Sequence, residues 1–483
     1  MKKISLKIRY LKSLDKQKSL DIQMGSSIYF MGICGTAMAS LAIYLKRQGF
    51  FVSGSDENIY PPMSLKLKKE GISLFKYDRD NIKTSFSLII VGNVISSSHV
   101  EIAKAKQLNI PVISFPEFLQ QNLLSQTKNI VVAGTHGKST SSSLMAWVLK
   151  KSYQNPSFFV GGIPNNFNSS LRVRDSKYFV IEGDEYDTSF FAKHAKFFHY
   201  NPNYVLLTGV EFDHADIYKD LADIKKTFSQ FIKQIPSQGC LVAYADNLVV
   251  RELLSSCSAP VLTYGVKYGD FKIKNRILKK NLQIVEVFSK NQKTYQIEIP
   301  LLGIHNALNS LGVFILAKYL KWEEEKILGA LKSFKGLKKR LEFKFEFQKA
   351  KIFEDFAHHP TAIQMGLSAL KERYVKQRLL LVFEPQSFTA CSHFFQKQYI
   401  SSFEKADLIF IAKPYKISKV LKQKRLSVET LVKDLKQKKK EAFYYSDFKI
   451  LEKDLRKHIK ENDIVVFMSS GSCGHILDRL KKT

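Results

Sequence analysis

One glycine-rich loop, lying between an apolar run and a helical pattern, constrains the fold of this chain more than any other feature. The loop occupies residues 134–140 and reads Gly-Thr-His-Gly-Lys-Ser-Thr. Residues 130–133 before it are all apolar and predict a buried strand, and residues 141–150 after it carry apolar side chains at helical spacing. A strand, a glycine turn and a helix in this order are typical of a parallel sheet covered by helices. The loop therefore predicts an α/β fold.

The residue types of the loop also indicate what it binds. Its glycines allow backbone N–H groups to face an anion, and the start of the following helix adds partial positive charge. Lys138 can reach the terminal phosphates of a nucleotide, and Ser139 or Thr140 can hold Mg²⁺. The loop departs from the usual G-x-x-x-x-G-K pattern, because Val132 stands where the first glycine is expected. The predicted nucleotide-binding residues here are Gly134, Thr135, His136, Gly137, Lys138, Ser139 and Thr140.

Composition limits the other possibilities. A length of 483 residues predicts about two to four domains. The five cysteines form no C-x-x-C pair, which argues against a zinc site or a disulfide framework and predicts a cytoplasmic protein. No apolar run is long enough to span a membrane, so membrane insertion is not expected. Residues 1–24 are basic but lack the apolar core of a signal peptide, and we predict a short extension outside the fold.

The formal net charge of +31 raises the question of nucleic-acid binding. The basic residues are spread along the whole chain, and their densest stretch, residues 433–440, adjoins an amphipathic pattern typical of a solvated helix face. We therefore predict no nucleic-acid partner and expect the charge to help attract anionic substrates. A basic ATPase that binds nucleic acid remains an alternative of another class.

The first segment, residues 25–126, has the pattern of a Rossmann-like domain. A strand at 28–30 is followed by a turn with Gly32 and Gly35, a helix from Thr36, a second strand, and Asp56. The spacing differs from G-x-G-x-x-G, so a nicotinamide cofactor is not favoured, and a pyrophosphate at the helix N-terminus is expected. Alternatively, the glycines only make a tight turn. A later strand at 88–91 ends at Gly92 and Asn93.

The second segment, residues 127–336, begins at the glycine-rich loop. A strand at 178–181 runs into Glu182 and further acids, the kind of ligand that Mg²⁺ beside ATP requires. A strand at 204–208 is followed by His214 among three acids, Glu211, Asp213 and Asp216, which could bind a second metal or form an exposed acidic loop. His305 and Asn306 open an amphipathic helix, where such a pair is usually a cap.

The third segment, residues 337–483, alternates strand patterns with helical ones and predicts another parallel sheet. Asp355 and the pair His358 and His359 follow its first strand, at the end where open α/β sheets bind ligands. Adjacent histidines rarely share one metal ion, so hydrogen bonding to a ligand is favoured. The predicted fold is α/β with three domains: a Rossmann-like N-terminal domain, a central P-loop ATPase-type domain and a Rossmann-like C-terminal domain.

In their order along the chain, these motifs resemble the Mur ligase family. The resemblance covers residues 26–477 and rests on seven stretches: 32–36, 134–140, 182–187, 211–214, 305–306, 339–342 and 355–360. It implies an ATP-dependent amide ligase. Such an enzyme converts a carboxylate into an acyl phosphate, which an amine then attacks. It also implies a UDP-sugar-binding domain at 25–126, an ATP-binding domain at 127–336 and a domain for the amine substrate at 337–483.

The resemblance further implies roles for individual residues. Lys138, Glu182 and His214 would be catalytic, and the metal Mg²⁺ would be held by Ser139, Thr140, Glu182 and His214. His305 and Asn306 would contact the adenine, Arg340 the phosphates and Asp355 the ribose of ATP. The residues implied for the UDP-sugar are Gly32, Gly35, Thr36, Asp56 and Asn93.

Substrate choice within the family is the finest of these predictions. Residues 60–64, 184–191 and 210–217 resemble the branch that joins the salvaged murein tripeptide L-Ala-γ-D-Glu-meso-diaminopimelate to UDP-N-acetylmuramate in peptidoglycan recycling. The alternative is the biosynthetic branch that adds L-alanine, which His136 and the run at 355–360 also resemble. Gln386 stands where an arginine is expected in the tripeptide branch, and no lysine in 224–229 matches the carbamylated lysine of other members.

Overall fold

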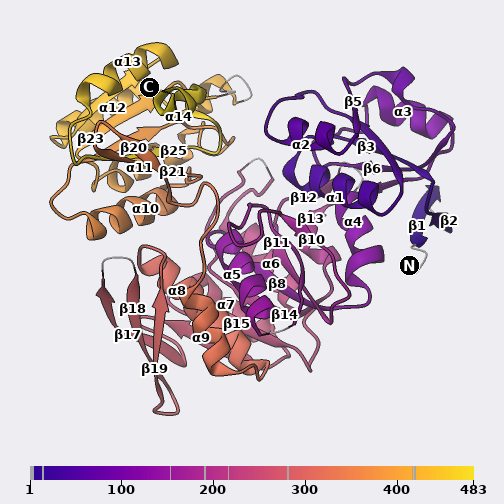
Figure 1. Cartoon of the computed structure of the whole chain (residues 1–483), viewed down its shortest axis with the longest axis horizontal. Coiled ribbons are helices and arrows are strands. Elements are labelled where there is room, and N and C mark those ends of the chain that lie inside the picture. Colours follow the sequence, from indigo (N-terminus) through magenta and orange to yellow (C-terminus); the bar gives the residue numbers. More distant parts are fainter. Residues whose placement is uncertain are drawn as a thin grey trace.

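The chain forms three α/β domains, each built around its own sheet. The computed structural model describes residues 5–482 except 14–15, 153, 190–191, 216, 280–281, 416 and 418–419. Parts of three predicted motifs, namely residues 1–4, Phe190, Phe191 and Asp216, lie outside the described residues. Figure 1 shows the first domain (indigo) and the third domain (orange to yellow) on either side above the middle domain. The predicted three-domain α/β class is confirmed.

The first domain has a five-stranded, all-parallel sheet with the order β5-β4-β3-β6-β7. The strand bounds are β3 (Ser27–Met31), β4 (Phe51–Ser55), β5 (Ser73–Phe75), β6 (Phe86–Val91) and β7 (Val112–Ser114). The helices are α1 (Thr36–Arg47), α2 (Met63–Lys69), α3 (Val100–Gln107) and α4 (Phe115–Leu119). The strand order reverses at β3, so the turns after β3 and β6 lie at the crevice where such sheets bind ligands.

The prediction that residues 1–24 lie outside the fold is wrong for the part that the structure describes. Strands β1 (Ser5–Ser13) and β2 (Lys16–Gln23) form an antiparallel hairpin. Leu6, Ile8 and Ile22 are buried in an apolar cluster that the first and middle domains share. The backbone N–H groups of Lys7 and Arg9 donate to side chains of the π-helical turn Gln120–Leu124, at 3.0 and 2.7 Å. Alternating apolar residues give this ribbon one face to bury.

The middle domain has a ten-stranded sheet with the order β10-β9-β11-β8-β14-β15-β16-β17-β18-β19. Its strands are β8 (Lys128–Ala133), β9 (Ser157–Phe159), β10 (Leu171–Arg172), β11 (Tyr178–Gly183), β14 (Pro202–Leu207), β15 (Cys240–Tyr244), β16 (Val261–Gly265), β17 (Phe271–Leu278), β18 (Gln283–Ser289) and β19 (Thr294–Ile299). Strand β8 pairs in parallel with both β11 and β14, so these three carboxyl ends meet at one edge.

The α-helices of the described part of this domain are α5 (Lys138–Lys151), α6 (Leu221–Ile232), α7 (Leu248–Leu253), α8 (Ile304–Tyr319) and α9 (Glu324–Lys332). A small separate hairpin consists of β12 (Asp187–Ser189) and β13 (Ala192–Ala195). The antiparallel extension β17–β19 was not predicted, although buried positions alternate along β18 as in a strand with one covered face.

The third domain has a six-stranded sheet with the order β20-β21-β25-β22-β23-β24, in which only β20 is antiparallel to its neighbour. The strands are β20 (Glu342–Phe347), β21 (Ala350–Asp355), β22 (Leu379–Phe383), β23 (Leu408–Ala412), β24 (Glu441–Tyr445) and β25 (Ile464–Met468). The helices are α10 (Pro360–Arg373), α11 (Gln396–Ser402), α12 (Val428–Gln437), α13 (Phe448–His458) and α14 (Ile476–Lys481). Lys433 and Lys436 of α12 are exposed, which confirms a solvated helix face.

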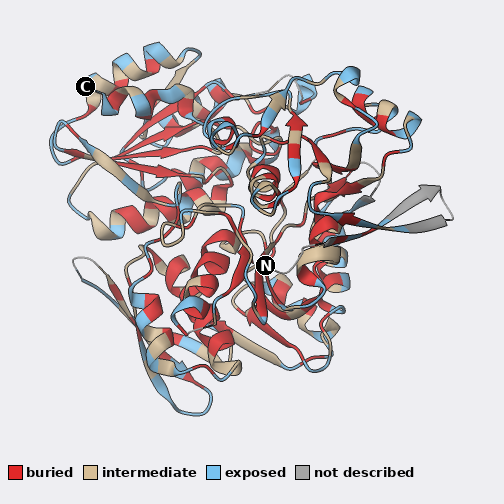
Figure 2. Cartoon of the chain, turned by 45° about the vertical axis from the view of Figure 1, so that its right-hand side comes forward, coloured by how far each residue is buried: buried red, intermediate tan, exposed pale blue. Residues whose placement is uncertain are grey.

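Buried strands form the centre of all three domains, and exposed residues concentrate on the outer helix faces (Figure 2). Strands β22, β23 and β25 are buried at every position, because helices cover both faces of a parallel sheet. Among the described residues, no helix combines the length and the apolar character that crossing a membrane requires.

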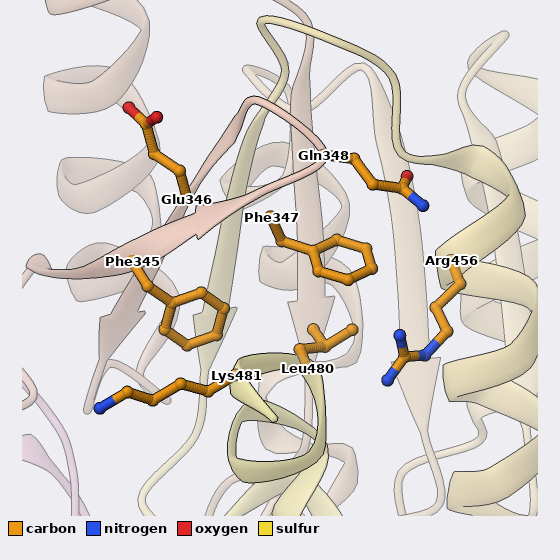
Figure 3. Close-up of a pocket in the computed structure, with 7 residues that line it drawn as sticks. All are labelled: Phe345, Glu346, Phe347, Gln348, Arg456, Leu480 and Lys481. Carbon is orange, nitrogen blue, oxygen red and sulfur yellow. The ribbon is translucent and has the colours of Figure 1, made fainter. Parts of the chain in front are cut away.

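A hollow on the third domain lies away from the predicted site residues. Figure 3 shows it between the β20 hairpin and α14, lined by Phe345, Glu346, Phe347, Gln348, Arg456, Leu480 and Lys481. The Arg456 guanidinium lies over the Phe347 ring and pairs with Glu452 at 2.8 Å. None of the predicted catalytic or ligand-binding residues lines this hollow, so it is not the candidate active site.

Candidate active site

The glycine-rich loop joins the end of β8 to α5. The helix begins at Lys138 rather than at the predicted residue 141, so Lys138, Ser139 and Thr140 form its first turn. Gly134 and Gly137 have φ of +129° and +80°. A Cβ on Gly134 would lie 2.6 Å from the Gly209 carbonyl oxygen, and one on Gly137 would lie 2.5 Å from Asn309 Oδ1. Both positions therefore require glycine.

Lys138 is held by a carboxylate that follows β11. Its Nζ lies 2.7 Å from Glu185 Oε2 and 2.9 Å from Glu185 Oε1, and only 3% of the Glu185 side chain is exposed. His214 Nε2 donates to the same Glu185 Oε1 at 3.0 Å. Glu185 thus joins the loop lysine to the histidine after β14.

The charges of this group stabilise one another. Burial lowers the pKa of Lys138, but Glu185 and Asp184 raise it further, so the net pKa is raised and the ammonium stays charged. Burial raises the pKa of Glu185, but Lys138 and His214 outweigh this and lower it. The pKa of Asp184 falls to about 2, since Lys196 and Lys138 overcome the effect of burial. These contacts therefore keep Lys138 positively charged beside the glycine-rich loop.

Ser139 and Glu182 supply oxygen atoms beside this lysine. Ser139 Oγ donates to Glu182 Oε1 at 2.8 Å, and Glu182 Oε2 accepts from the Gly161 backbone N–H at 2.7 Å. Thr140 lies on the same helical turn and is 8% exposed. Hydroxyl and carboxylate oxygens are the ligands that Mg²⁺ prefers, so these residues fit a magnesium ion at the nucleotide phosphates.

The predicted cluster of His214 with the acids around it is wrong in one respect. His214, which has φ of +58°, contacts Glu185 and Asp213, whereas Glu211 faces another way. Glu211 Oε2 accepts from Thr361 Oγ1 at 2.7 Å and from His136 Nε2 at 3.4 Å. Burial raises the pKa of Glu211, but the His136 contact lowers it to about 2. The loop between β14 and α6 therefore sends His214 toward Glu185 and Glu211 toward His136 and Thr361.

The two adjacent histidines of the third domain hydrogen-bond to the protein itself. His358 Nδ1 donates to the Phe356 carbonyl oxygen at 3.1 Å, and His359 Nε2 donates to the Phe212 carbonyl oxygen at 3.3 Å. Burial, reinforced by the nearby His136, lowers the pKa of His359 to about 4. The two side chains have separate partners within the chain, and the expected hydrogen bonding to a ligand stays a prediction.

The residues expected at the adenosine lie around the start of α8 and the linker to the third domain. Gly303 is the N-terminal cap of α8 and makes no side-chain cap bond, so the expectation of a cap formed by His305 or Asn306 is wrong. Asn306 Nδ2 donates instead to the Leu302 carbonyl oxygen at 2.7 Å. The buried Nδ1 of His305 has no hydrogen-bond partner among the described residues. Because this atom has almost no exposed surface, a ligand reaches it only if neighbouring residues move.

Arg340 and Asp355 connect the third domain to the phosphate loop. Arg340 Nη2 lies 3.4 Å from Ser139 Oγ, within reach of phosphates bound at the loop. The buried Asp355 accepts backbone N–H groups from Leu341 at 2.7 Å and Ala357 at 2.6 Å. Burial raises the pKa of Asp355 although Arg340 opposes the shift. In this structure Asp355 fixes the linker.

In the first domain, the glycine turn is closed by the backbone and by Asp56. Gly32 has φ of +80° and donates its N–H to the Ser55 carbonyl oxygen at 2.8 Å. Asp56 Oδ2 accepts the Cys34 N–H at 2.9 Å. Helix α1 starts at Thr36 with Gly35 as its cap, and Asn93 is exposed at the end of β6. The N–H groups at this helix start fit a pyrophosphate.

Several residues of the site were not singled out from the sequence. Glu185 belongs to the acidic run that was predicted, but nothing in the run distinguishes it from Glu182. Asn309 lies one helical turn after Asn306 and contacts the loop at Gly137, and its i+3 spacing was an available signal. No sequence pattern indicated Thr361 as a site residue, because its partner Glu211 lies in another domain.

The fold and the site together define a class of protein: a three-domain ATP-dependent ligase that forms a carbon–nitrogen bond. Residues 27–127 match the family described as "Mur ligase family, catalytic domain", residues 132–317 match "Mur ligase middle domain", and residues 339–471 match "Mur ligase, glutamate ligase domain". The chain belongs to the Mur ligase family.

Individual relatives cover almost the whole chain. The UDP-N-acetylmuramate–L-alanyl-γ-D-glutamyl-meso-2,6-diaminoheptandioate ligase of Haemophilus influenzae is 33% identical over 94% of this chain and 99% of its own. The UDP-N-acetylmuramate–L-alanine ligase of Clostridium botulinum is 32% identical over 92% of this chain and 95% of its own. The crystal structure of a murein peptide ligase from Psychrobacter arcticus has 28% identity and a TM-score of 0.73, and the match covers 95% of this chain and 98% of that one.

Proposed function

We propose that this protein joins L-Ala-γ-D-Glu-meso-diaminopimelate to UDP-N-acetylmuramate, with ATP and Mg²⁺, in cytoplasmic peptidoglycan recycling. The observation that carries the proposal is the 33% identity to a ligase named for that tripeptide, over 99% of the relative's length. Three stretches at 60–64, 184–191 and 210–217, read from the sequence alone, point to the same branch. The domain roles follow the proposal: UDP-sugar at 25–126, ATP at 127–336 and tripeptide at 337–483.

The proposed chemistry proceeds in two steps. The sugar carboxylate attacks the γ-phosphorus of ATP and forms an acyl phosphate, and ADP leaves. The amine of the tripeptide then attacks the acyl carbon, and the amide forms as phosphate leaves. The protein contributes mainly by positioning the reactants and neutralising charge.

The contacts around the loop support specific roles in these steps. Lys138, kept charged by Glu185, would neutralise the transferring phosphoryl group. Ser139, Thr140, Glu182 and His214 would hold magnesium, which supplies further positive charge at the phosphates. Arg340 would reach the phosphates from the third domain. His305 and Asn306 would contact the adenine and Asp355 the ribose, while Gly32, Gly35, Thr36, Asp56 and Asn93 would hold the UDP-sugar.

A second candidate is the ligase that adds free L-alanine to UDP-N-acetylmuramate. Its supporting observation is the 32% identity to a ligase named for L-alanine. Gln386 also favours it, because an arginine was expected there to meet the peptide carboxylate. The Gln386 amide packs against Gly471. A Cβ at position 471 would lie 1.9 Å from Gln386 Nε2, so only glycine fits beside this amide.

The deciding experiment compares the two amines with one enzyme preparation. ATP, UDP-N-acetylmuramate and either the tripeptide or L-alanine are incubated with the protein, and phosphate release is measured across amine concentrations. We expect a much higher kcat/KM for the tripeptide. A site that pairs the tripeptide's extra charged groups has protein side chains that stay unpaired when L-alanine binds. A higher kcat/KM for L-alanine would transfer the assignment to the biosynthetic ligase. Release without either amine measures uncoupled hydrolysis and is subtracted.

A further inference from the structure

We propose that His136, Glu211 and His359 form a transition-metal site of the zinc class that joins the middle domain to the third domain. The site is separate from the predicted magnesium ligands Ser139 and Glu182. It goes beyond the proposed ligase activity and does not depend on which amine the enzyme uses.

The geometry of three donor atoms supports the site. One ring nitrogen of His136, one Glu211 carboxylate oxygen and one ring nitrogen of His359 all lie within 4.8 Å of one another. Glu211 Oε2 is 3.4 Å from His136 Nε2 and 4.0 Å from His359 Nδ1. Two donors about 2.0–2.2 Å from a tetrahedral zinc ion lie about 3.3–3.6 Å apart, so the His136–Glu211 separation already matches. The His359 ring nitrogen has to move closer to Glu211 to complete the site.

The surroundings of the ligands are those of a built site. His359 Nε2 donates to the Phe212 carbonyl oxygen at 3.3 Å, which directs Nδ1 toward Glu211. Metal-binding histidines usually donate their second ring N–H in this way. Thr361 Oγ1 donates to Glu211 Oε2 at 2.7 Å and orients the carboxylate. The Thr361 backbone N–H also donates to His359 Nδ1 at 3.3 Å, a long contact that a metal ion would replace.

The donor set selects the kind of ion. Two imidazole nitrogens and one carboxylate oxygen suit zinc and its neighbours, whereas magnesium sites are built mainly from oxygen ligands. Three protein ligands leave a fourth position open, as in zinc sites that bind water or another ligand. His136 lies in the phosphate loop, so an ion here would connect that loop to α10 of the third domain. Bound zinc is expected to raise the thermal transition temperature of the whole chain.

The adjacent histidine provides a matched control. His358 Nδ1 is directed at the Phe356 carbonyl oxygen, and His358 is not one of the three converging ligands. His359→Gln and Glu211→Gln remove ligands, whereas His358→Gln removes a histidine from the same segment. We expect zinc affinity to fall at least about tenfold in the first two variants, because even outer partners of metal ligands contribute 10–100-fold. We expect no change in His358→Gln.

The experiment is isothermal titration of the full-length, EDTA-treated protein with ZnCl₂ in the presence of excess MgCl₂. One equivalent of zinc in the wild type, lost in both ligand variants and retained in His358→Gln, supports the site. Absence of zinc binding in the wild type, or equal binding in His359→Gln, overturns it. Circular dichroism checks the fold of each variant. If His359→Gln does not fold, His136→Ala, which changes the loop side of the site, decides in its place.

Discussion

The first and middle domains use the same local device, a glycine turn between a strand and a helix, in different ways. In the first domain, the turn after β3 is closed by its own backbone and by Asp56, which accepts the Cys34 N–H. In the middle domain, the loop after β8 carries Lys138, which meets Glu185 from β11 and, through it, His214 from the loop after β14. The first turn offers mainly backbone N–H groups, whereas the second concentrates charge.

Under the proposed function, this difference would separate binding from catalysis. Backbone N–H groups at a helix start can hold a pyrophosphate in the ground state and the transition state alike, which lowers KM without raising kcat. A charged lysine beside metal-binding oxygens can respond to the charge that develops during phosphoryl transfer. The turns share a backbone pattern, and the side chains that other strands bring to them decide their roles. Four predictions test this comparison.

The largest effect is expected at the charged loop. Lys138→Ala removes the cation at the transferring phosphoryl group and should reduce kcat by roughly 10²–10³-fold. Phosphate release with saturating substrates measures it. Lys150→Ala is the matched control, because Lys150 is an exposed lysine in the last turn of the same helix. Near-normal turnover of a folded Lys138→Ala variant would show that the loop is not the site of phosphoryl transfer.

A smaller effect is expected at the oxygen and nitrogen donors beside the loop. Glu182→Ala or His214→Ala should raise the magnesium concentration needed for half-maximal turnover by about 10–100-fold, the scale of lost metal-site interactions. Magnesium titrations of turnover measure this, and calorimetry measures UDP-N-acetylmuramate affinity, which should remain close to wild type. Loss of sugar affinity with unchanged magnesium dependence would mean that the two domains have exchanged roles.

A substitution in the first-domain turn should change the KM for the UDP-sugar. Asp56→Ala removes the acceptor for the Cys34 and Asn58 N–H groups, each at 2.9 Å. A hydrogen bond to a charged acceptor contributes about 1.5 kcal/mol or more, so KM for the UDP-sugar should rise about tenfold with kcat nearly unchanged. Asp80→Ala, an exposed carboxylate of the same domain, serves as the control. A fall in kcat equal to that of Lys138→Ala would remove the distinction between the turns.

The smallest effect concerns pH. Burial, with Arg276 and His136 nearby, lowers the pKa of His305 to about 4, against about 6.5 in an unfolded chain. Between these values the unfolded chain binds more protons, so His305 contributes full stability above about pH 6.5 and loses it as pH falls toward 4. The loss is at most about 1.4 kcal/mol per pH unit.

Thermal unfolding between pH 7 and pH 5 measures this contribution. His305→Gln should flatten the decline of the transition temperature, because the variant has no imidazole to protonate. The first-domain turn at residues 32–36 contains no histidine, so variants there should leave the decline unchanged. An identical pH dependence in wild type and His305→Gln would show that this imidazole is solvated.

Much of the fold followed from local patterns. Apolar runs such as 130–133 and 178–181 predicted buried parallel strands, because a strand covered on both faces must be apolar at every position. Glycines located the turns at the carboxyl ends of those strands, where ligands bind. The order of the motifs then indicated the family. The hairpin at residues 5–23 was missed, because its short alternation stands within a strongly basic segment.

By itself, the sequence determined the three-domain α/β class, the phosphate loop and the run of acids beside it. Only the tertiary structure decided which acid meets which partner. Glu182 and Glu185 belong to one short run, yet Glu182 binds Ser139 and Glu185 binds Lys138. Spacing within a strand reports which residues are buried, but side chains from separate strands and domains meet only after the sheets are assembled. For the same reason, the contact of Glu211 with Thr361 required the third domain to be in place.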